Sequence, residues 1–259
     1  MRILLIGDIV GRAGRRAVKE SLPELTGRFA LDLIVANGEN AAGGSGLTRE
    51  VAAELFSVGI DVLTTGNHVW DQKDIFNFIA AEERILRPEN FPPGVPGRGV
   101  HMYRTKKNEP VGVVNLAGRV FMPHLDCPFR KADEILARLS GQVKVTVVDF
   151  HGEATSEKMA FGWYVDGRVS AVCGTHTHVQ TADERILPNG TAYISDVGMT
   201  GPRDSVIGVK KEVVINRFLT QLPARFEVAK GPYQFNAVLL EIDEETGKAK
   251  KIDRIYNNE

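Results

Sequence analysis

The chain alternates short apolar runs with segments of helical periodicity along most of its 259 residues. The apolar runs, rich in Val, Ile and Leu, are typical of buried strands and cover residues 2–7, 32–37, 61–66, 110–116, 143–150 and 169–174. Between them the residue spacing predicts helices over residues 14–25, 48–58 (with Thr48 as N-cap), 71–82, 129–139 and 155–165. Strands that alternate with helices of this length form βαβ units, so the sequence predicts an α/β fold with a largely parallel sheet.

Two segments depart from this alternation. Residues 87–99, RPENFPPGVPGRG, are dense in Pro and Gly and predict a long surface loop. Towards the end of the chain, two strand-like runs flank the turn-like EETGK, which predicts a β-hairpin near residues 233–256. Because strands of the same kind continue beyond the loop, we expect residues 1–259 to form a single domain.

Charge and cysteine content narrow the class of protein. With 32 Lys and Arg against 33 Asp and Glu, the net charge of −1 predicts no general basic surface for nucleic acid, although a bound nucleotide or RNA segment stays open. Cys127 and Cys173 are isolated, which favours a reducing cytoplasm. No stretch approaches the ~18 apolar residues of a membrane span, so we expect a soluble protein without a membrane partner. Homo-oligomer formation is left open.

Unusual polar residues follow five of the predicted strands. The carboxyl ends of parallel strands open onto one edge of the sheet, where ligands bind, so these residues are expected to meet. Each has a structural alternative on its own: Asp8 could cap a helix, and His68 could pack near Trp70. Coincidence explains the whole set poorly. Its members are Asp8, Glu39, Asn40, Asn67, His68, His151, His176 and His178.

These residue types indicate a metal site. Imidazole, carboxylate and amide groups suit Mn, Fe or Zn better than a metal that prefers thiolates. A catalytic zinc takes three protein ligands, fewer than the set offers, whereas two ions that share a carboxylate would use them all. The sequence therefore favours a dinuclear metal site. A mononuclear zinc hydrolase and an RNA-binding or regulatory module with a structural metal are the alternatives.

The stretch CGTHTHV, residues 173–179, contributes two of the histidines. If this stretch is extended, alternation turns Thr177 away from the side shared by His176 and His178. Cys173 belongs to the buried strand, where we expect it to fill apolar space and not to bind metal.

The chain resembles the YmdB-like phosphodiesterases, a branch of the calcineurin-like metallophosphoesterases. The resemblance runs from Met1 to the C-terminal hairpin and is carried by GD (7–8), NGENAAGG (37–44), GNHVWD (66–71), DFHGEATSEK (149–158), GTHTHVQTAD (174–183) and DVGMTGP (196–202). The wider superfamily opens with Asp-x-His, whereas Val10 stands at that third position here. Glu39, in GEN, also replaces the usual bridging aspartate. Both departures match the YmdB-like branch.

This resemblance implies a sandwich of two mixed sheets flanked by helices, α/β/β/α. It also implies two divalent or transition-metal ions, iron or manganese ahead of zinc, and hydrolysis of small phosphodiesters such as 2′,3′-cyclic nucleotides by a metal-activated water. Hydrolysis of phosphomonoesters is the alternative.

The resemblance also implies roles for single residues. The implied ligands of the first metal are Asp8, Glu39, Asn40 and His178. Those of the second are Glu39, Asn67, His151 and His176, with Glu39 bridging. His68 is the implied proton donor to the leaving oxygen. Arg12 and Arg203 lie just beyond two of these loops and are candidates for binding the substrate phosphate.

Overall fold

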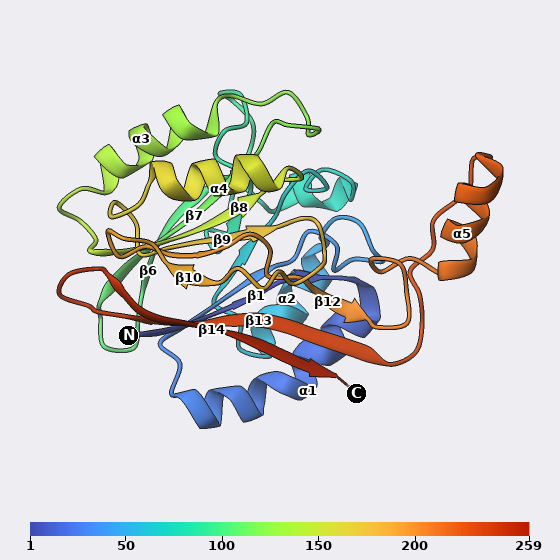
Figure 1. The fold of residues 1–259 in the computed structure, drawn as a ribbon, viewed down its shortest axis with the longest axis horizontal. Helices are drawn as coiled ribbons and strands as arrows, with labels where there is room; N and C mark the ends of the chain where they lie inside the picture. The colour runs from blue at the N-terminus through green and yellow to red at the C-terminus, as the bar shows by residue number, and fades with distance from the viewer. Residues whose placement is uncertain (259) are drawn as a thin grey trace.

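The computed structural model describes residues 1–258, which form two β-sheets packed face to face between two layers of helices (Figure 1). The first sheet contains β1 (Arg2–Ile6), β2 (Asp8–Ile9), β3 (Leu33–Asn37), β4 (Val62–Thr64), β5 (Ile85–Leu86), β12 (Met199–Pro202), β13 (Tyr233–Ile242) and β14 (Ala249–Asn258). The second contains β6 (Val100–Arg104), β7 (Pro110–Ala117), β8 (Val145–His151), β9 (Ala171–Thr175), β10 (Arg185–Ile186) and β11 (Ala192–Ile194). The predicted α/β/β/α sandwich is confirmed.

Both sheets are mixed. The first has the order β2-β12-β13-β1-β3-β4-β5, with β14 paired to β13, and the second has the order β10-β11-β9-β8-β7-β6. Strands β1, β3, β4 and β5 are mutually parallel, as are β7, β8, β9 and β11. Each sheet therefore has a parallel centre whose carboxyl ends can assemble a site.

Helices cover the outer faces of the sandwich. They are α1 (Gly11–Phe29), α2 (Arg49–Ser57), α3 (Pro128–Leu139) and α4 (Thr155–Tyr164), and a further helix, α5 (Lys211–Thr220), lies outside these layers. In Figure 1, α3 and α4 lie on one face and α1 on the opposite face, while α5 projects from the body. The predicted N-cap of α2 is confirmed, because the Thr48 side chain accepts a hydrogen bond from Val51 N at 3.3 Å. Among residues 1–258, no helix is long and apolar enough to cross a membrane.

The alternation of side chains along β1 shows how one apolar run serves two layers of core. Ile3 and Leu5 pack into the layer between the two sheets, whereas Leu4 and Ile6 pack under α1 and α2. A strand that is buried on both faces must be apolar at successive positions, which is why these strands appear in the sequence as continuous apolar runs.

The predicted helix over residues 71–82 is wrong. Only the 3-10 turn η1 (Lys73–Asn77) forms there. The Asp74 carboxylate accepts a hydrogen bond at 2.8 Å from the backbone N–H of Arg49, in the first turn of α2. The apolar side chains of Ile75, Phe78 and Ile79 are buried without a continuous helix. Tertiary packing here overrides the helical spacing of the sequence.

The loop over residues 87–99 is organised around a buried guanidinium group. Arg87 is 8% exposed and donates to the carbonyl oxygens of Pro88 at 2.8 Å, Pro96 at 3.1 Å and Gly97 at 3.3 Å. These bonds satisfy backbone acceptors that the loop cannot pair in a regular element, so the side chain fixes the loop's course.

Candidate metal centre

The predicted site residues come from both sheets, and not from one sheet edge. Asp8 lies in β2, Glu39 follows β3 and Asn67 follows β4, all in the first sheet. His151 ends β8, and His176 directly follows β9, in the second sheet. The site therefore lies where the carboxyl ends of the central parallel strands of one sheet meet those of the other sheet.

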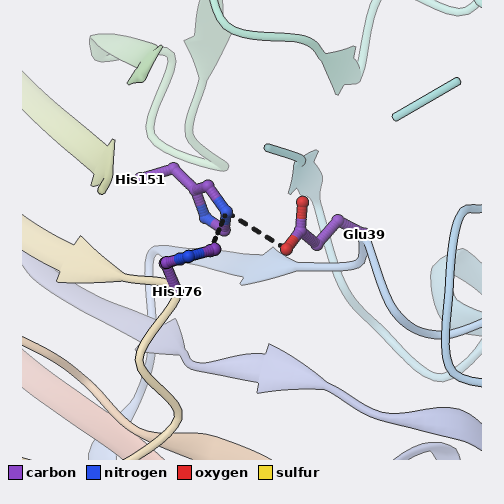
Figure 2. A group of neighbouring side chains, drawn as sticks. All are labelled: Glu39, His151 and His176. Carbon is purple, nitrogen blue, oxygen red and sulfur yellow. Dashed lines mark hydrogen bonds and ion pairs between the residues drawn. The ribbon is translucent and has the colours of Figure 1, made fainter. Parts of the chain in front are cut away.

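Three polar atoms converge on one ring nitrogen of His151. Its Nε2 atom lies 3.0 Å from Asn67 Oδ1, 3.1 Å from Glu39 Oε1 and 3.0 Å from His176 Nδ1. A single imidazole nitrogen cannot form a good hydrogen bond with all three. Ligand atoms about 2.0–2.2 Å from a common metal ion, however, stand about 3 Å apart when adjacent. Figure 2 shows Glu39, His151 and His176 pointing towards one another, and this geometry fits a cation.

A second group of candidate ligands also includes Glu39. Asp8 is fully buried, and its Oδ1 atom has no hydrogen-bond partner in the described chain. His178 Nε2 forms a long ion pair with this oxygen at 3.8 Å, a distance beyond hydrogen-bond length. Asn40 Nδ2 lies 3.3 Å from His178 Nε2 and 3.3 Å from Glu39 Oε1, and rotation of the amide by 180° would place the ligand atom Oδ1 there instead. A cation here would satisfy the orphaned oxygen of Asp8, and Glu39 would be shared by both positions.

Burial and charge tune the protonation of these groups. Burial raises the pKa of Asp8 to about 6. Burial opposes charge on both Glu39 and His151, but their mutual attraction prevails and holds the pKa of Glu39 below, and that of His151 above, the usual range. Burial and the neighbouring His151 lower the pKa of His176 to about 3. A metal ion binds carboxylates and neutral imidazoles, so a cation here would displace the proton that Glu39 holds on His151, whereas His176 is already neutral.

A buried carboxylate orients His151. His151 Nδ1 lies 2.9 Å from the hydroxyl oxygen of Thr175, which in turn donates to Asp149 Oδ1 at 2.7 Å. Because the Thr175 proton goes to Asp149, the hydroxyl accepts from His151 Nδ1–H. In the neutral ring, the form that binds a metal, Nε2 would therefore have its lone pair towards the site. Asn37 and Thr64, in the other sheet, also donate to Asp149. This network fixes the tautomer of His151 and joins the two sheets beneath the site.

Replacing Asp149 with asparagine should weaken metal binding without removing a ligand. Outer partners of this kind are worth about 10–100-fold in metal affinity or activity, and we expect a loss of that size for Asp149→Asn. The measurement is metal affinity by competition with a coloured chelator. The matched control is Asp166→Asn, a change at a half-buried aspartate that hydrogen-bonds to the 189–191 turn. Unchanged affinity in Asp149→Asn would contradict the orienting role.

The other two histidines are also held by their second ring nitrogens. His178 Nδ1 donates to the carbonyl oxygen of Ile207 at 2.9 Å, so its Nε2 faces Asp8 and Asn40. His176 has the opposite arrangement, with Nδ1 in the site and Nε2 3.1 Å from Glu153 Oε2. Each imidazole is thereby held with one ring nitrogen in the cluster, His178 beside Asp8 and His176 beside His151.

The backbone from residue 176 to residue 178 is not extended, so the predicted alternation is wrong. Strand β9 ends at Thr175, and His176 and His178 have φ values of 101° and 68°. Thr177 does not simply point away, because its N–H and hydroxyl both donate to Asp196 Oδ2, at 3.0 and 2.7 Å. Asp196 is itself paired with Lys158 Nζ at 2.8 Å, and both side chains are buried. A buried ion pair thus fixes the turn that presents the two histidines.

Asp149, Glu153, Lys158 and Asp196 are not among the residues predicted from the sequence. Asp149 carried a usable signal, because it precedes His151 by two positions and so shares its face of the strand. Lys158 and Asp196 pair across 38 residues, and only the fold reveals that contact.

His68 lies at the edge of the centre and is 40% exposed. Its backbone N–H donates to Glu39 Oε2 at 3.2 Å, and its Nδ1 is 2.7 Å from Asp71 Oδ2 and 3.2 Å from Ser45 Oγ. These contacts occupy Nδ1 and leave Nε2 available. Gly66 permits the close approach of this loop, since a Cβ atom there would overlap the ring of His151.

The two predicted arginines lie in different pockets. Arg203 lines a pocket of about 500 Å³ together with His178. Arg12 lines another pocket of about 800 Å³, whose walls, among the described residues, include none of the predicted metal ligands. The geometry therefore brings Arg203, and not Arg12, beside the candidate centre.

Cys173 is fully buried in β9, and burial raises the pKa of its thiol well above the usual range. Within the described chain, the cluster that could hold a metal consists of Glu39, His151 and His176, without a cysteine.

Comparison with known proteins gives a consistent result. A family model described as YmdB-like protein matches residues 4–255. A Bacillus subtilis (strain 168) protein named 2′,3′-cyclic-nucleotide 2′-phosphodiesterase is 52% identical over 259 residues, which is 100% of this chain and 98% of that protein. A crystal structure of a hypothetical protein from Thermus thermophilus matches with a TM-score of 0.94 and 44% identity, covering 100% of both chains. A structure described as a novel phosphatase of Mycoplasma pneumoniae also has a TM-score of 0.94, with 36% identity, covering 100% of this chain and 93% of that one.

Proposed function

The chain belongs to the YmdB-like protein family, and from that premise we propose that it is a metal-dependent phosphodiesterase acting on 2′,3′-cyclic nucleotides. The observation that carries the proposal is the convergence of Glu39, Asn67 and His176 on His151 Nε2, beside a buried Asp8 oxygen without a partner. The name of the B. subtilis relative supplies the substrate class.

The residues present fit two metal positions. We assign Asp8, Glu39, Asn40 and His178 to the first and Glu39, Asn67, His151 and His176 to the second. The donor atoms are nitrogen and oxygen without sulfur, which suits manganese, iron or zinc. Each position would have four protein ligands, more than the three of a catalytic zinc, so we propose iron or manganese ahead of zinc. When bound, two such ions would stabilise charge on the phosphoryl oxygens and lower the pKa of a water.

The protein's own side chains would orient the substrate and supply the leaving-group proton. A water gives up one proton to the solvent and its oxygen forms the new bond to phosphorus. The bond from phosphorus to O2′ breaks, and a nucleoside 3′-phosphate is released. We assign to His68 Nε2 the proton that O2′ gains, because Asp71 and Ser45 hold the other ring nitrogen. Arg203, beside His178, is the arginine that we assign to the substrate.

The setting we propose is the cytoplasm, with residues 1–259 acting as one domain. Both cysteines are free, Cys173 within the core and Cys127 partly buried, which suits a reducing compartment.

The test is anaerobic purification with metal quantification, followed by assay against 2′,3′-cyclic nucleotides, phosphomonoesters and short RNAs. We expect about two ions per chain and turnover of the cyclic nucleotides to 3′-phosphates. Turnover of phosphomonoesters alone would overturn the proposed substrate class, and one ion per chain would favour a mononuclear site.

Removing the metal should abolish turnover and lower the melting temperature. Asp8 and Glu39 then remain buried without a cation to offset their charge. Metal at about 100 times Kd adds about 2.7 kcal/mol to the free energy of unfolding, or about 5–10 °C for a chain of this size. Calorimetry with EDTA, and again after Mn²⁺ is restored, measures the difference. An unchanged melting temperature would argue against buried metal positions.

A further inference from the structure

One pocket is lined both by His178, an assigned metal ligand, and by residues of the C-terminal hairpin. It has a volume of about 500 Å³, within the usual range for small-molecule sites. Gln234, Asn236, Arg254 and Tyr256 contribute to the wall made by β13 and β14. Because His178 belongs both to this wall and to the assigned ligands of the first metal, the pocket adjoins that metal position.

The register of the hairpin explains why these side chains share one face. Asn236 in β13 pairs with Tyr256 in β14, and residues paired in this way point to the same side of the sheet. The intervening Phe235 and Ile255 point the other way, into the core beneath α1. Alternation along the two strands thus separates a core face from a pocket face.

Tyr256 presents an aromatic surface to this pocket. The residue is 56% exposed, and among residues 1–258 no second aromatic ring or arginine stacks on it. Ile207 and Val179, 53% and 61% exposed, add apolar surface around the same pocket. Apolar walls with an aromatic ring and a few amide groups are suited to a planar heterocycle.

A hydrogen bond connects Ile207, in the pocket wall, to the proposed metal ligand His178. The carbonyl oxygen of Ile207 accepts the hydrogen bond from His178 Nδ1 at 2.9 Å, while the Ile207 side chain lines the pocket. A group bound against Ile207 would therefore have a fixed position relative to His178.

We propose that this pocket binds the nucleobase of the substrate, with the base stacked on Tyr256. The inference rests on the proposed function, because it takes the phosphate of a cyclic nucleotide to lie at the metals. Stacking on one ring tolerates any base, so the pocket would confer a preference for nucleotides over other cyclic phosphodiesters and little discrimination among bases.

The experiment compares two substrates that share a five-membered cyclic phosphate. One is 2′,3′-cyclic AMP, and the other is glycerol 1,2-cyclic phosphate, which has no base. In the metal-loaded enzyme, Tyr256→Ala should raise KM for the nucleotide by about tenfold, within the range for loss of one stacked base, and leave kcat/KM for the glycerol compound unchanged. Tyr256→Phe should behave as wild type. Trp163→Ala, at an aromatic residue of α4 that is 49% exposed, is the control for loss of a surface ring.

Two results would overturn the proposal: equal losses on both substrates, or no change on either. Binding of adenosine 3′-monophosphate separates this inference from the proposed function. If the wild-type enzyme turned over neither substrate, the proposed function would fail, and the Kd of Tyr256→Ala would still decide the pocket. A Kd raised about tenfold supports the base site, and an unchanged Kd removes it.

Discussion

Replacing Glu39 by glutamine should leave the protein folded but deplete both metal positions and abolish phosphodiesterase activity. Glutamine keeps the shape of the buried side chain while removing the charge that both ligand sets share. Oε1 of Glu39 lies 3.1 Å from His151 Nε2 and 3.3 Å from Asn40 Nδ2, so it contacts one residue of each assigned ligand set. Outer partners of metal ligands are worth about 10–100-fold in affinity, so loss of a shared ligand should exceed that range at both positions.

Elemental analysis of Glu39→Gln, with the metal content of each position resolved by titration, is the measurement. Glu50→Gln, at an exposed position in the first turn of α2, is the matched control and should keep two ions per chain. Circular dichroism in EDTA shows whether the variant is folded. Full occupancy of one position in the variant would remove the bridging role of Glu39.

His68→Ala should differ from Glu39→Gln in its metal content: we expect it to retain both metals while losing most of its turnover. The side chain is not in the assigned ligand sets, and its Nε2 is free to protonate the leaving oxygen. General acid catalysis by a positioned histidine typically contributes about 10²–10⁴-fold, and we expect kcat for 2′,3′-cyclic nucleotides to fall by that amount.

The leaving group gives a sharper version of this test. A p-nitrophenolate leaves without needing a proton, so His68→Ala should lose much less activity on a p-nitrophenyl phosphodiester than on a cyclic nucleotide. His101→Ala, at a half-buried histidine of edge strand β6, is the control. Loss of metal from His68→Ala would make His68 a ligand, and equal losses on both substrates would exclude it as the acid.

The strands and the residues that meet at the candidate centre could be predicted because both have local patterns in the sequence. Each candidate ligand lies at or shortly after the end of an apolar run, and parallel strands bring such positions together whatever the details of packing. His151 and His176, 25 residues apart, are adjacent in space for this reason. The predicted assignment of individual ligands to two metals stays a proposal.

The hydrogen-bond network that orients those residues could not be predicted, because it depends on how the two sheets face each other. Asn37 reaches Asp149 across 112 residues, and no local pattern marks that pair. The predicted helix over residues 71–82 is wrong for a similar reason, because the Asp74 carboxylate accepts a hydrogen bond from the backbone N–H of Arg49 at the start of α2. Likewise, the sharp turn after β9 depends on Asp196 and Lys158, which lie on other elements.

The backbone of the turn from His176 to His178 lowers the stability of the folded chain. Two non-glycine residues with positive φ occupy a backbone region in which each is typically strained by about 1–3 kcal/mol. Glycine would relieve that strain but would bring no imidazole. Selection for folding stability alone would favour glycine at both positions. The two histidines therefore represent a trade-off in which stability is lost so that activity is retained.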